Sequence, residues 1–400
     1  MNQFIELTEK YSPNNYSPLD IVLTEGKGAH VKDSEGNTYI DCVAGFSVLN
    51  QGHCHPAIIK AFLDQSQKIT MTSRALYSDN LGKWEEKICK LANKNKVLPM
   101  NTGTEAVETA IKVATKWAQD VKGINAKDAE IIAMEGNFHG RTIGSLSLSS
   151  NDGYKEGFGV LAGNIKYGEF GNVEHIKSLI TPQTTAIIME PIQGEGGVNI
   201  PPKHFIKEVK ALCEANNILF IADEIQVGLG RTGKMFAMEW EDVEPDMYLL
   251  GKALGGGLYP ISAIVANDDV MQVLTPGTHG STFGGNPLAC AVSIAALDVL
   301  IDEGLAERSR QLGEKLLSGL QSIDSSMIKE VRGRGLFIGL ELNEPAQSIV
   351  SSINEQGVLC KETQGNIIRL APPLVIDEKD IDAIISVITQ TIEENSKQTT

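Results

Sequence analysis

The sequence predicts an α/β fold, with a large domain built on a mostly parallel central sheet and a smaller α+β domain. Two short apolar runs, at 185–190 and 218–223, show no alternation of polar and apolar residues, which is typical of strands buried on both faces. A stretch with helical periodicity, at 203–216, separates them. Strand, helix and strand in succession indicate a parallel sheet. A chain of 400 residues with 42% hydrophobic content is long enough to bury such a core.

The individual elements follow from local patterns. The helix at 203–216 comes after two prolines and carries one apolar stripe, formed by Phe205, Ile206, Val209, Leu212 and Cys213. Further helices are predicted at 288–303, 309–323 and 378–394, and further strands at 335–342 and 367–370. We therefore expect an N-terminal segment at 1–50 that packs with the smaller domain, a large domain at 51–287 and a small C-terminal domain at 288–400.

Composition and charge exclude several classes of function. The formal net charge is −16, whereas nucleic acids and anionic membranes favour clustered Lys and Arg. The first ten residues lack a basic segment followed by an apolar core, and no later stretch reaches the roughly 20 apolar residues of a membrane span. The six cysteines are dispersed, as is typical of reduced thiols. We expect a cytoplasmic protein that binds neither nucleic acid nor a membrane.

A lysine and an aspartate carry the most specific signal. Asp223 ends the predicted strand at 218–223, at the edge where α/β sheets place their ligands, and Lys252 stands in the glycine-rich segment 251–257. An acid in that place is also common as a helix cap, and most lysines are solvated. Together, they offer an amine that can hold an aldehyde as a Schiff base and a carboxylate that can keep a pyridine nitrogen protonated. The pair predicts a pyridoxal phosphate site.

Two segments could hold the phosphate of this cofactor. The turn at 101–104 opens a helix, whose free N–H groups and dipole favour an anion, although an ordinary capped helix has the same pattern. The segment 280–286 places two hydroxyls, Ser281 and Thr282, beside glycines.

Substrate carboxylates are best bound by arginine, because its planar fork makes two hydrogen bonds to them. Arg141 and Arg369 lie in glycine-rich or strand-end contexts, and Glu195 could pair with one of them; either arginine could also be a surface charge. His53 and His55 flank a cysteine, but ligands so close together in a turn lack the usual metal-site spacing, and we expect no metal.

With these motifs the chain resembles the class III, fold type I aminotransferases, which depend on pyridoxal phosphate, and among them the ornithine aminotransferases. The lysine and aspartate motifs are shared across the class. The N-terminal tyrosine and the C-terminal arginine segment narrow the resemblance to the ornithine branch. It extends nearly end to end and is carried by Asn14-Asn15-Tyr16, Asn50-Gln51-Gly52-His53-Cys54-His55-Pro56, Pro99-Met100-Asn101-Thr102-Gly103, Glu190-Pro191-Ile192-Gln193-Gly194-Glu195, Gly277-Thr278-His279-Gly280-Ser281-Thr282 and Ile367-Ile368-Arg369-Leu370-Ala371-Pro372-Pro373-Leu374-Val375-Ile376.

The resemblance implies a role in cofactor binding for several residues. Lys252 would hold the cofactor and move protons, Asp223 would pair with the pyridinium, Gln226 would hydrogen-bond the ring hydroxyl and Phe138 would stack on the ring.

The phosphate would be held from two subunits. The resemblance implies that Gly103 and Thr104 bind it, and that Ser281 and Thr282 reach the phosphate of the neighbouring subunit, so that a homodimer is the smallest complete unit.

The implied reaction is a ping-pong transfer of the δ-amino group of ornithine to 2-oxoglutarate. It gives glutamate and glutamate 5-semialdehyde, which cyclises to pyrroline-5-carboxylate. Arg141 would bind ornithine's α-carboxylate and Tyr16 its α-amine, while Glu195 neutralises Arg369. When glutamate or 2-oxoglutarate binds, Glu195 would swing aside so that Arg369 takes the α-carboxylate.

One residue departs from the family pattern, and other substrates stay open. Phe46 stands where ornithine aminotransferases usually carry a tyrosine that lines the substrate pocket, so a hydroxyl worth roughly 0.5–1.5 kcal/mol as a hydrogen-bonding group is lost. The alternative donors are N-acetylornithine, lysine and 4-aminobutyrate, and Tyr16 argues against the acetylated one. Racemases and decarboxylases share the scaffold but need no amino acceptor.

Overall fold

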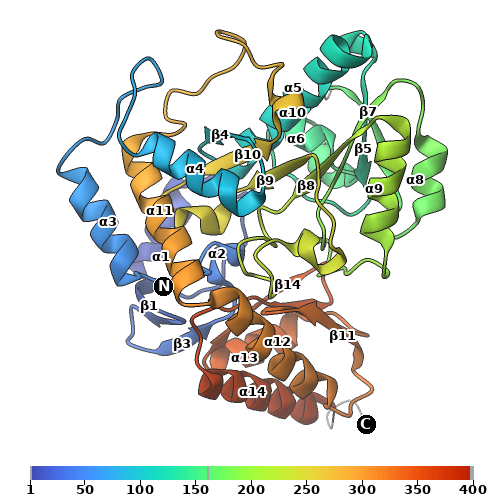
Figure 1. The fold of residues 1–400 in the computed structure, drawn as a ribbon. Coiled ribbons are helices and arrows are strands. Elements are labelled where there is room, and N and C mark those ends of the chain that lie inside the picture. The colour runs from blue at the N-terminus through green and yellow to red at the C-terminus, as the bar shows by residue number, and fades with distance from the viewer. Residues whose placement is uncertain (1, 160–161, 397–400) are drawn as a thin grey trace.

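The structure is a computed structural model that describes residues 2–159 and 162–396. Its centre is a seven-stranded sheet in the order β4-β10-β9-β8-β7-β5-β6 (Figure 1). Every pair of neighbours in it is parallel except the two that β10 forms with β9 and β4. The prediction of a mostly parallel central sheet is confirmed. The strands are β4 Lys96–Met100, β5 Glu130–Met134, β6 Asn164–Gly168, β7 Thr184–Met189, β8 Leu219–Asp223, β9 Met247–Leu250 and β10 Ser262–Ala266.

Helices cover both faces of this sheet (Figure 1). Side chains of successive strand residues alternate between two apolar cores, so that Ile187 and Phe220 join one core while Ile188 and Ile221 join the other. Helix α5 belongs to the second core, and α4, α9 and α11 belong to the first. The helices are α3 Pro56–Ser66, α4 Leu81–Ala92, α5 Gly103–Lys122, α6 Ile143–Ser147, α7 Asp152–Lys155, α8 Val173–Leu179, α9 Phe205–Asn216, α10 Asp268–Met271 and α11 Pro287–Asp302, with 3₁₀ turns η1 Ala126–Asp128, η2 Ala237–Glu241 and η3 Lys252–Gly255.

Two four-stranded sheets lie below the central one (Figure 1). The first, β1-β2-β3-β13, joins the two ends of the chain, because β3 pairs in parallel with β13. The second has the order β11-β12-β15-β14 and is antiparallel throughout. The remaining elements are α1 Gln3–Tyr11, β1 Leu23–Lys27, β2 His30–Asp33, β3 Thr38–Asp41, α2 Ala44–Ser47, α12 Leu305–Gln321, β11 Ile328–Arg334, β12 Phe337–Leu342, α13 Gln347–Glu355, β13 Val358–Leu359, β14 Lys361–Thr363, β15 Ile367–Leu370 and α14 Glu378–Ser396. The division into domains at residues 50 and 287 stays a prediction.

The predicted elements are found with small shifts of their ends. The strand expected at 335–342 begins at Phe337, because Gly335 forms a turn with φ +55° whose Cβ position would lie 2.4 Å from the backbone carbon of Thr232. That turn connects it to β11, a strand missing from the prediction. The helix expected from 309 begins at Leu305, after the left-handed Gly304. In the described ranges, no helix is long and apolar enough to cross a membrane.

Candidate active site

The candidate site lies where the central strands end. Asp223 is the last residue of β8, Glu190 follows β7, and Lys252 follows β9 after one glycine. Parallel strands of one sheet share this edge, which is where α/β folds bind ligands. The structure brings six of the predicted residues to one cavity of about 140 Å³, whose lining includes Lys252, Asp223, Gly103, Thr104, Phe138 and Gln226.

Asp223 is buried and held in a fixed orientation. Its Oδ1 accepts a hydrogen bond from the backbone N–H of Ile225 at 3.1 Å, and its Oδ2 lies 2.6 Å from Nδ1 of His139. Burial disfavours the charged imidazole, but the hydrogen bond and the charge of Asp223 outweigh it and raise the pKa of His139. His139 and the backbone amide of Ile225 together fix the orientation of the Asp223 carboxyl group.

Lys252 is set up to be neutral more readily than an ordinary lysine. Burial disfavours its charged form and lowers its pKa to about 8, although Glu195 and Asp223 act in the opposite direction. Its backbone lies in the left-handed region with φ 43°, a conformation that costs a non-glycine residue on the order of 1–3 kcal/mol. Such strain is tolerated where the surroundings fix the residue, and here it directs the amine from the end of β9 into the cavity.

The start of α5 forms the end of the cavity that suits an anion. Thr102 caps the helix by accepting from the N–H of Glu105, and the Glu105 carboxylate accepts from the N–H groups of Asn101 and Thr102. The amides of Gly103 and Thr104 come next, in the first turn, where N–H groups have no acceptor within the helix. A Cβ at Gly103 would lie 3.2 Å from Ile225, so a larger residue would crowd the cavity wall.

A partly buried ion pair stands beside Lys252. Nη1 of Arg369 donates to Oε1 of Glu195 at 2.7 Å, with the Arg369 side chain 8% exposed. Nε2 of Gln226 donates to the same oxygen at 3.1 Å and to the Phe46 carbonyl at 3.3 Å. Burial alone would raise the pKa of Glu195, but Arg369, Lys252 and Gln226 stabilise its charge and lower it. The predicted pairing of Glu195 with Arg369 is present in the structure, and the Phe46 ring lies 5.1 Å from the guanidinium.

The other predicted residues are placed outside this cavity. Arg141 is exposed and its guanidinium stacks 3.6 Å from the Tyr154 ring and 5.5 Å from the Phe138 ring. Tyr16 is 77% exposed and lines a different cleft, between α1 and the segment that follows it. Oγ of Ser281 accepts from the side chain of Asn101 at 3.0 Å, and Thr282 is exposed. The roles of these residues stay predictions.

Sequence reasoning missed the buried acid Glu190. Its carboxylate accepts from the backbone N–H of Phe138 at 3.0 Å and from that of Gly194 at 3.3 Å, and burial raises its pKa to about 7. Glu190 directly follows a buried strand, and this position was the available signal. The sequence patterns also assign His139 no part in the site, and the structure shows that its Nδ1 lies 2.6 Å from Oδ2 of Asp223.

The residues of the cavity fit pyridoxal phosphate. The cavity is surrounded by the Lys252 amine, the Asp223 carboxylate, the Phe138 ring and the N-terminus of α5. These groups suit, in the same order, the aldehyde, the ring nitrogen, the ring face and the phosphate of the cofactor. His139 also lines the cavity, and its Nε2 is buried without a hydrogen-bond partner in the described part of the chain, so this atom is available to a bound group.

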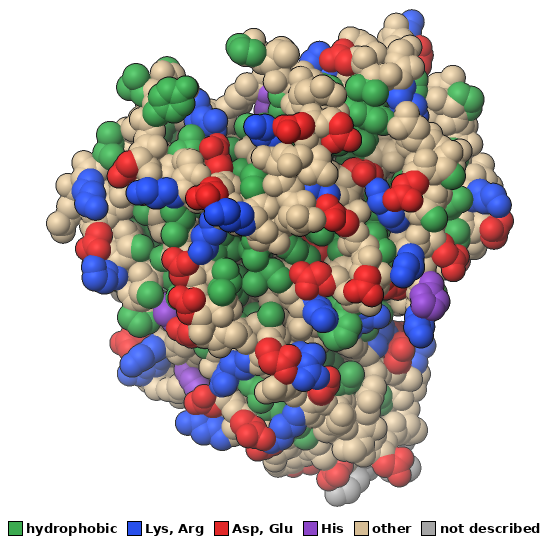
Figure 2. All heavy atoms as spheres, in the orientation of Figure 1, with side chains coloured by type: hydrophobic (Ala, Val, Ile, Leu, Met, Phe, Trp, Pro, Cys, Tyr) green, Lys and Arg blue, Asp and Glu red, His purple; other side chains and the backbone are tan. Residues whose placement is uncertain are grey.

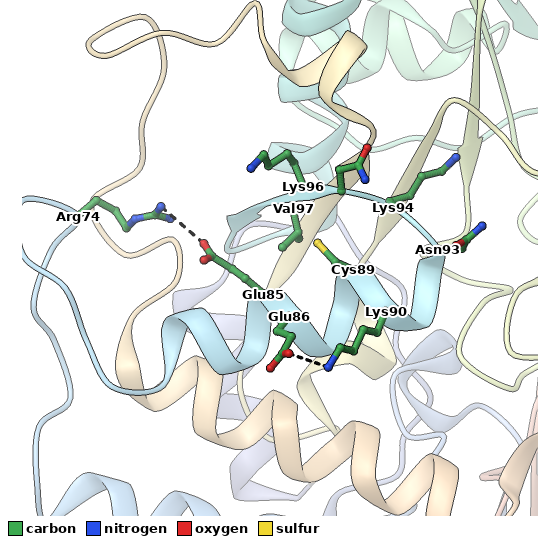
Figure 3. Close-up of a pocket in the computed structure, with 10 residues that line it drawn as sticks. Arg74, Glu85, Glu86, Cys89, Lys90, Asn93, Lys94, Lys96 and Val97 are labelled. Carbon is green, nitrogen blue, oxygen red and sulfur yellow. Dashed lines mark hydrogen bonds and ion pairs between the residues drawn. The ribbon is translucent and has the colours of Figure 1, made fainter.

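A larger groove, of about 780 Å³, lies elsewhere on the surface between α4 and β4 (Figure 3). Its charged residues mostly neutralise one another, since Arg74 lies 3.7 Å from Glu85, Lys90 lies 2.6 Å from Glu86, and Lys94 pairs with Glu244. None of the predicted catalytic or binding residues lines it. Size alone therefore does not identify the site.

Comparisons with known proteins agree with this site. Residues 11–392 match the family model for class-III aminotransferases. Ornithine aminotransferase 1 of Staphylococcus saprophyticus is 70% identical over 98% of this chain and 100% of its own length. An ornithine aminotransferase structure from Toxoplasma gondii, described as having partial occupancy of PLP at the active site, is 42% identical, with a TM-score of 0.96 over 98% of this chain and 95% of that one.

An acetylornithine aminotransferase from Elizabethkingia anophelis is also similar to this chain. It is 43% identical, with a TM-score of 0.89 and 98% of both chains covered. This chain has the fold type I architecture of the class-III aminotransferases, and the cofactor of that family is pyridoxal phosphate. The family match over almost the whole chain and the 70% identical relative show that this chain belongs to the class-III aminotransferases.

Proposed function

We propose that this protein transfers the δ-amino group of L-ornithine to 2-oxoglutarate, giving L-glutamate 5-semialdehyde and L-glutamate. The semialdehyde then cyclises with loss of water to pyrroline-5-carboxylate. The observation that carries the proposal is the ion pair between Glu195 and Arg369 next to Lys252. The relative from Staphylococcus saprophyticus, which is named an ornithine aminotransferase, supports the same substrate.

The ion pair suits an enzyme with two unlike substrates. Ornithine enters with its δ-amine, so no carboxylate is attached to the reacting carbon, and an uncompensated arginine there would favour the wrong amino acid. Glutamate and 2-oxoglutarate do carry such a carboxylate. Glu195 neutralises Arg369 for ornithine, and its side chain turns away when Arg369 binds the α-carboxylate of the second substrate, with Arg141 at the distal one. Arg141 binds the α-carboxylate of ornithine and Tyr16 its α-amine.

The chemistry at the reacting carbon depends on Lys252. Pyridoxal phosphate supplies an aldehyde that accepts the amino group and a ring that withdraws electrons from the substrate carbon. Lys252 removes a proton from Cδ of ornithine and later returns one to Cα of the incoming 2-oxoglutarate. A pKa of about 8 gives its amine both protonation states near neutral pH, which a group acting as base and then as acid requires. Asp223 keeps the ring nitrogen protonated, Gln226 binds the ring hydroxyl, and Phe138 supports the ring.

We also propose that the enzyme works in the cytoplasm as a homodimer in which Ser281 and Thr282 contact the phosphate of the partner's site. Exposed large apolar side chains support a contact between copies, because Phe283, which follows Thr282, is 53% exposed and Leu76 and Tyr77 are exposed on the loop between α3 and α4. Figure 2 shows hydrophobic side chains projecting at the upper left, where Figure 1 places that loop.

The test is to incubate the pyridoxal phosphate-loaded enzyme with ornithine and 2-oxoglutarate and to measure pyrroline-5-carboxylate as its aminobenzaldehyde adduct. N-Acetylornithine, lysine and 4-aminobutyrate are tested in parallel by glutamate formation. We expect formation of pyrroline-5-carboxylate that depends on 2-oxoglutarate and exceeds turnover of the other donors. Faster turnover of another donor would refute ornithine as the substrate. Loss of L-ornithine without 2-oxoglutarate, with formation of D-ornithine or putrescine instead of pyrroline-5-carboxylate, would indicate a racemase or decarboxylase.

A further inference from the structure

The backbone of Glu195 is tied to the C-terminal sheet. Oγ1 of Thr363 and Nε2 of Gln364 both donate to the Glu195 carbonyl oxygen, each at 2.8 Å. These residues form the tip of the hairpin between β14 and β15, where Gln364 adopts a left-handed conformation with φ 54°. A non-glycine residue in that conformation is uncommon, and here it places the amide side chain over the loop that carries Glu195.

The same hairpin carries Arg369. Lys361 of β14 pairs with Arg369 of β15, and Thr363 pairs with Ile367. The hairpin therefore touches Glu195 twice, through Thr363 and Gln364 at its carbonyl and through Arg369 at its carboxylate. One short hairpin therefore contacts the backbone of Glu195 and also carries the arginine that pairs with its side chain.

The residues after Glu195 are fastened to the same sheet. The Arg332 side chain, on β11, donates to the carbonyl of Gly197 at 2.7 Å and to that of Val198 at 3.2 Å. A Cβ at Gly197 would lie 2.5 Å from Cδ1 of Ile367, so the loop packs directly on β15. Before Glu195, Glu190 accepts from the N–H of Gly194. With the main chain held on both sides, the Glu195 side chain is the part of this loop that can move.

We propose that Thr363 and Gln364 are positioning residues that set the amino-donor specificity of this enzyme by fixing the main chain of Glu195 opposite Arg369. This inference rests on the proposed exchange of partners by Arg369. A fixed main chain favours the ion pair, because Glu195 then loses less conformational entropy when its side chain pairs with Arg369. When the two anchors are removed, Glu195 covers Arg369 less completely. Glutamate then gains relative to ornithine.

The test compares variants that remove the anchoring hydrogen bonds with matched variants that keep them. Thr363→Val replaces the hydroxyl with a methyl group of the same shape, and Thr363→Ser retains it. Gln364→Met removes the amide at nearly constant length, and Gln390→Met makes the same change at an exposed residue of α14. Glu195→Ala serves as the reference for complete loss of the ion pair. For each loaded enzyme, kcat/KM is measured for ornithine and for glutamate, together with the melting temperature.

We expect the double variant Thr363→Val/Gln364→Met to raise the glutamate-to-ornithine ratio of kcat/KM by roughly 3- to 30-fold, since each lost hydrogen bond contributes modestly. Thr363→Ser and Gln390→Met should keep the wild-type ratio. A wild-type ratio in the double variant, with a raised ratio in Glu195→Ala, overturns this inference and leaves the proposed function intact. A wild-type ratio in Glu195→Ala overturns both this inference and the exchange of partners. Failure of the wild-type enzyme to use ornithine refutes the function itself.

Discussion

Replacing Glu195 by alanine should shift the enzyme from ornithine towards glutamate. In the wild-type protein, glutamate must displace the Glu195 carboxylate from Arg369, whose guanidinium is held at 2.7 Å and is nearly inaccessible to water. A hydrogen bond between charged groups contributes about 1.5–3 kcal/mol. Glutamate no longer has to break it in the variant. That energy corresponds to a gain of roughly 10- to 150-fold in kcat/KM for glutamate relative to ornithine.

The assay measures both half-reactions by the absorbance change of the bound cofactor under single-turnover conditions. Glu130→Gln is the control, because Glu130 forms an ion pair of 2.8 Å with Lys166 but stands at the opposite end of β5 from the site. The control should leave the ratio of the two substrates unchanged. If Glu195→Ala also leaves it unchanged, Glu195 does not mask Arg369 and the reasoning is wrong.

Three further predictions follow from other buried groups. Burial lowers the pKa of Lys252 to about 8, and only its neutral amine reacts with the aldehyde of pyridoxal phosphate. The rate at which the apoenzyme takes up the cofactor should therefore rise about tenfold per pH unit below pH 8 and level off above it. An uptake rate independent of pH would contradict the lowered pKa. Arg231 is fully buried and donates to the carbonyls of Leu336 and Pro372 and to the side chain of Asn50. Arg231→Met should therefore lower the free energy of unfolding, measured with urea, by about 3 kcal/mol or more. No measurable loss would show that these hydrogen bonds do not stabilise the fold. Burial raises the pKa of Glu224 to about 8, above the value in the unfolded chain, so Glu224 stabilises the fold at low pH and this contribution is lost as pH rises towards 8. Glu224→Gln should therefore flatten the dependence of the unfolding free energy on pH below 8. An unchanged dependence would exclude Glu224 as its source.

The parts of the fold that could be predicted from sequence are those whose signal is local. The strand ending at Asp223 is entirely buried, which accounts for its continuous apolar run, and its carboxyl end marks the site. The glycine-rich segment around Lys252 is the local signal that identifies the amine that acts together with Asp223. Strand β11 escaped prediction because its residues are partly exposed and include several charges, which hides the alternation of a strand.

The parts of the site that could not be predicted depend on contacts between distant residues. His139 meets Asp223 across 84 positions, and Thr363 meets the Glu195 carbonyl across 168. Threonine and glutamine at a hairpin tip have the composition of any surface turn, so nothing local distinguishes Thr363 and Gln364. The resemblance of motifs identified Arg369 and Glu195 as a pair, but only the folded chain shows which hairpin holds them together.

The most direct test of the central claim follows the nitrogen atom. The loaded enzyme is given 2-oxoglutarate and ornithine labelled with ¹⁵N either at the δ-amine or at the α-amine, and the glutamate formed is analysed by mass spectrometry. Transfer of the δ-amine predicts that glutamate carries the label from δ-labelled ornithine and none from α-labelled ornithine. Label arriving from the α-amine would mean that Arg369 binds ornithine's α-carboxylate, and it would contradict the role assigned to Glu195.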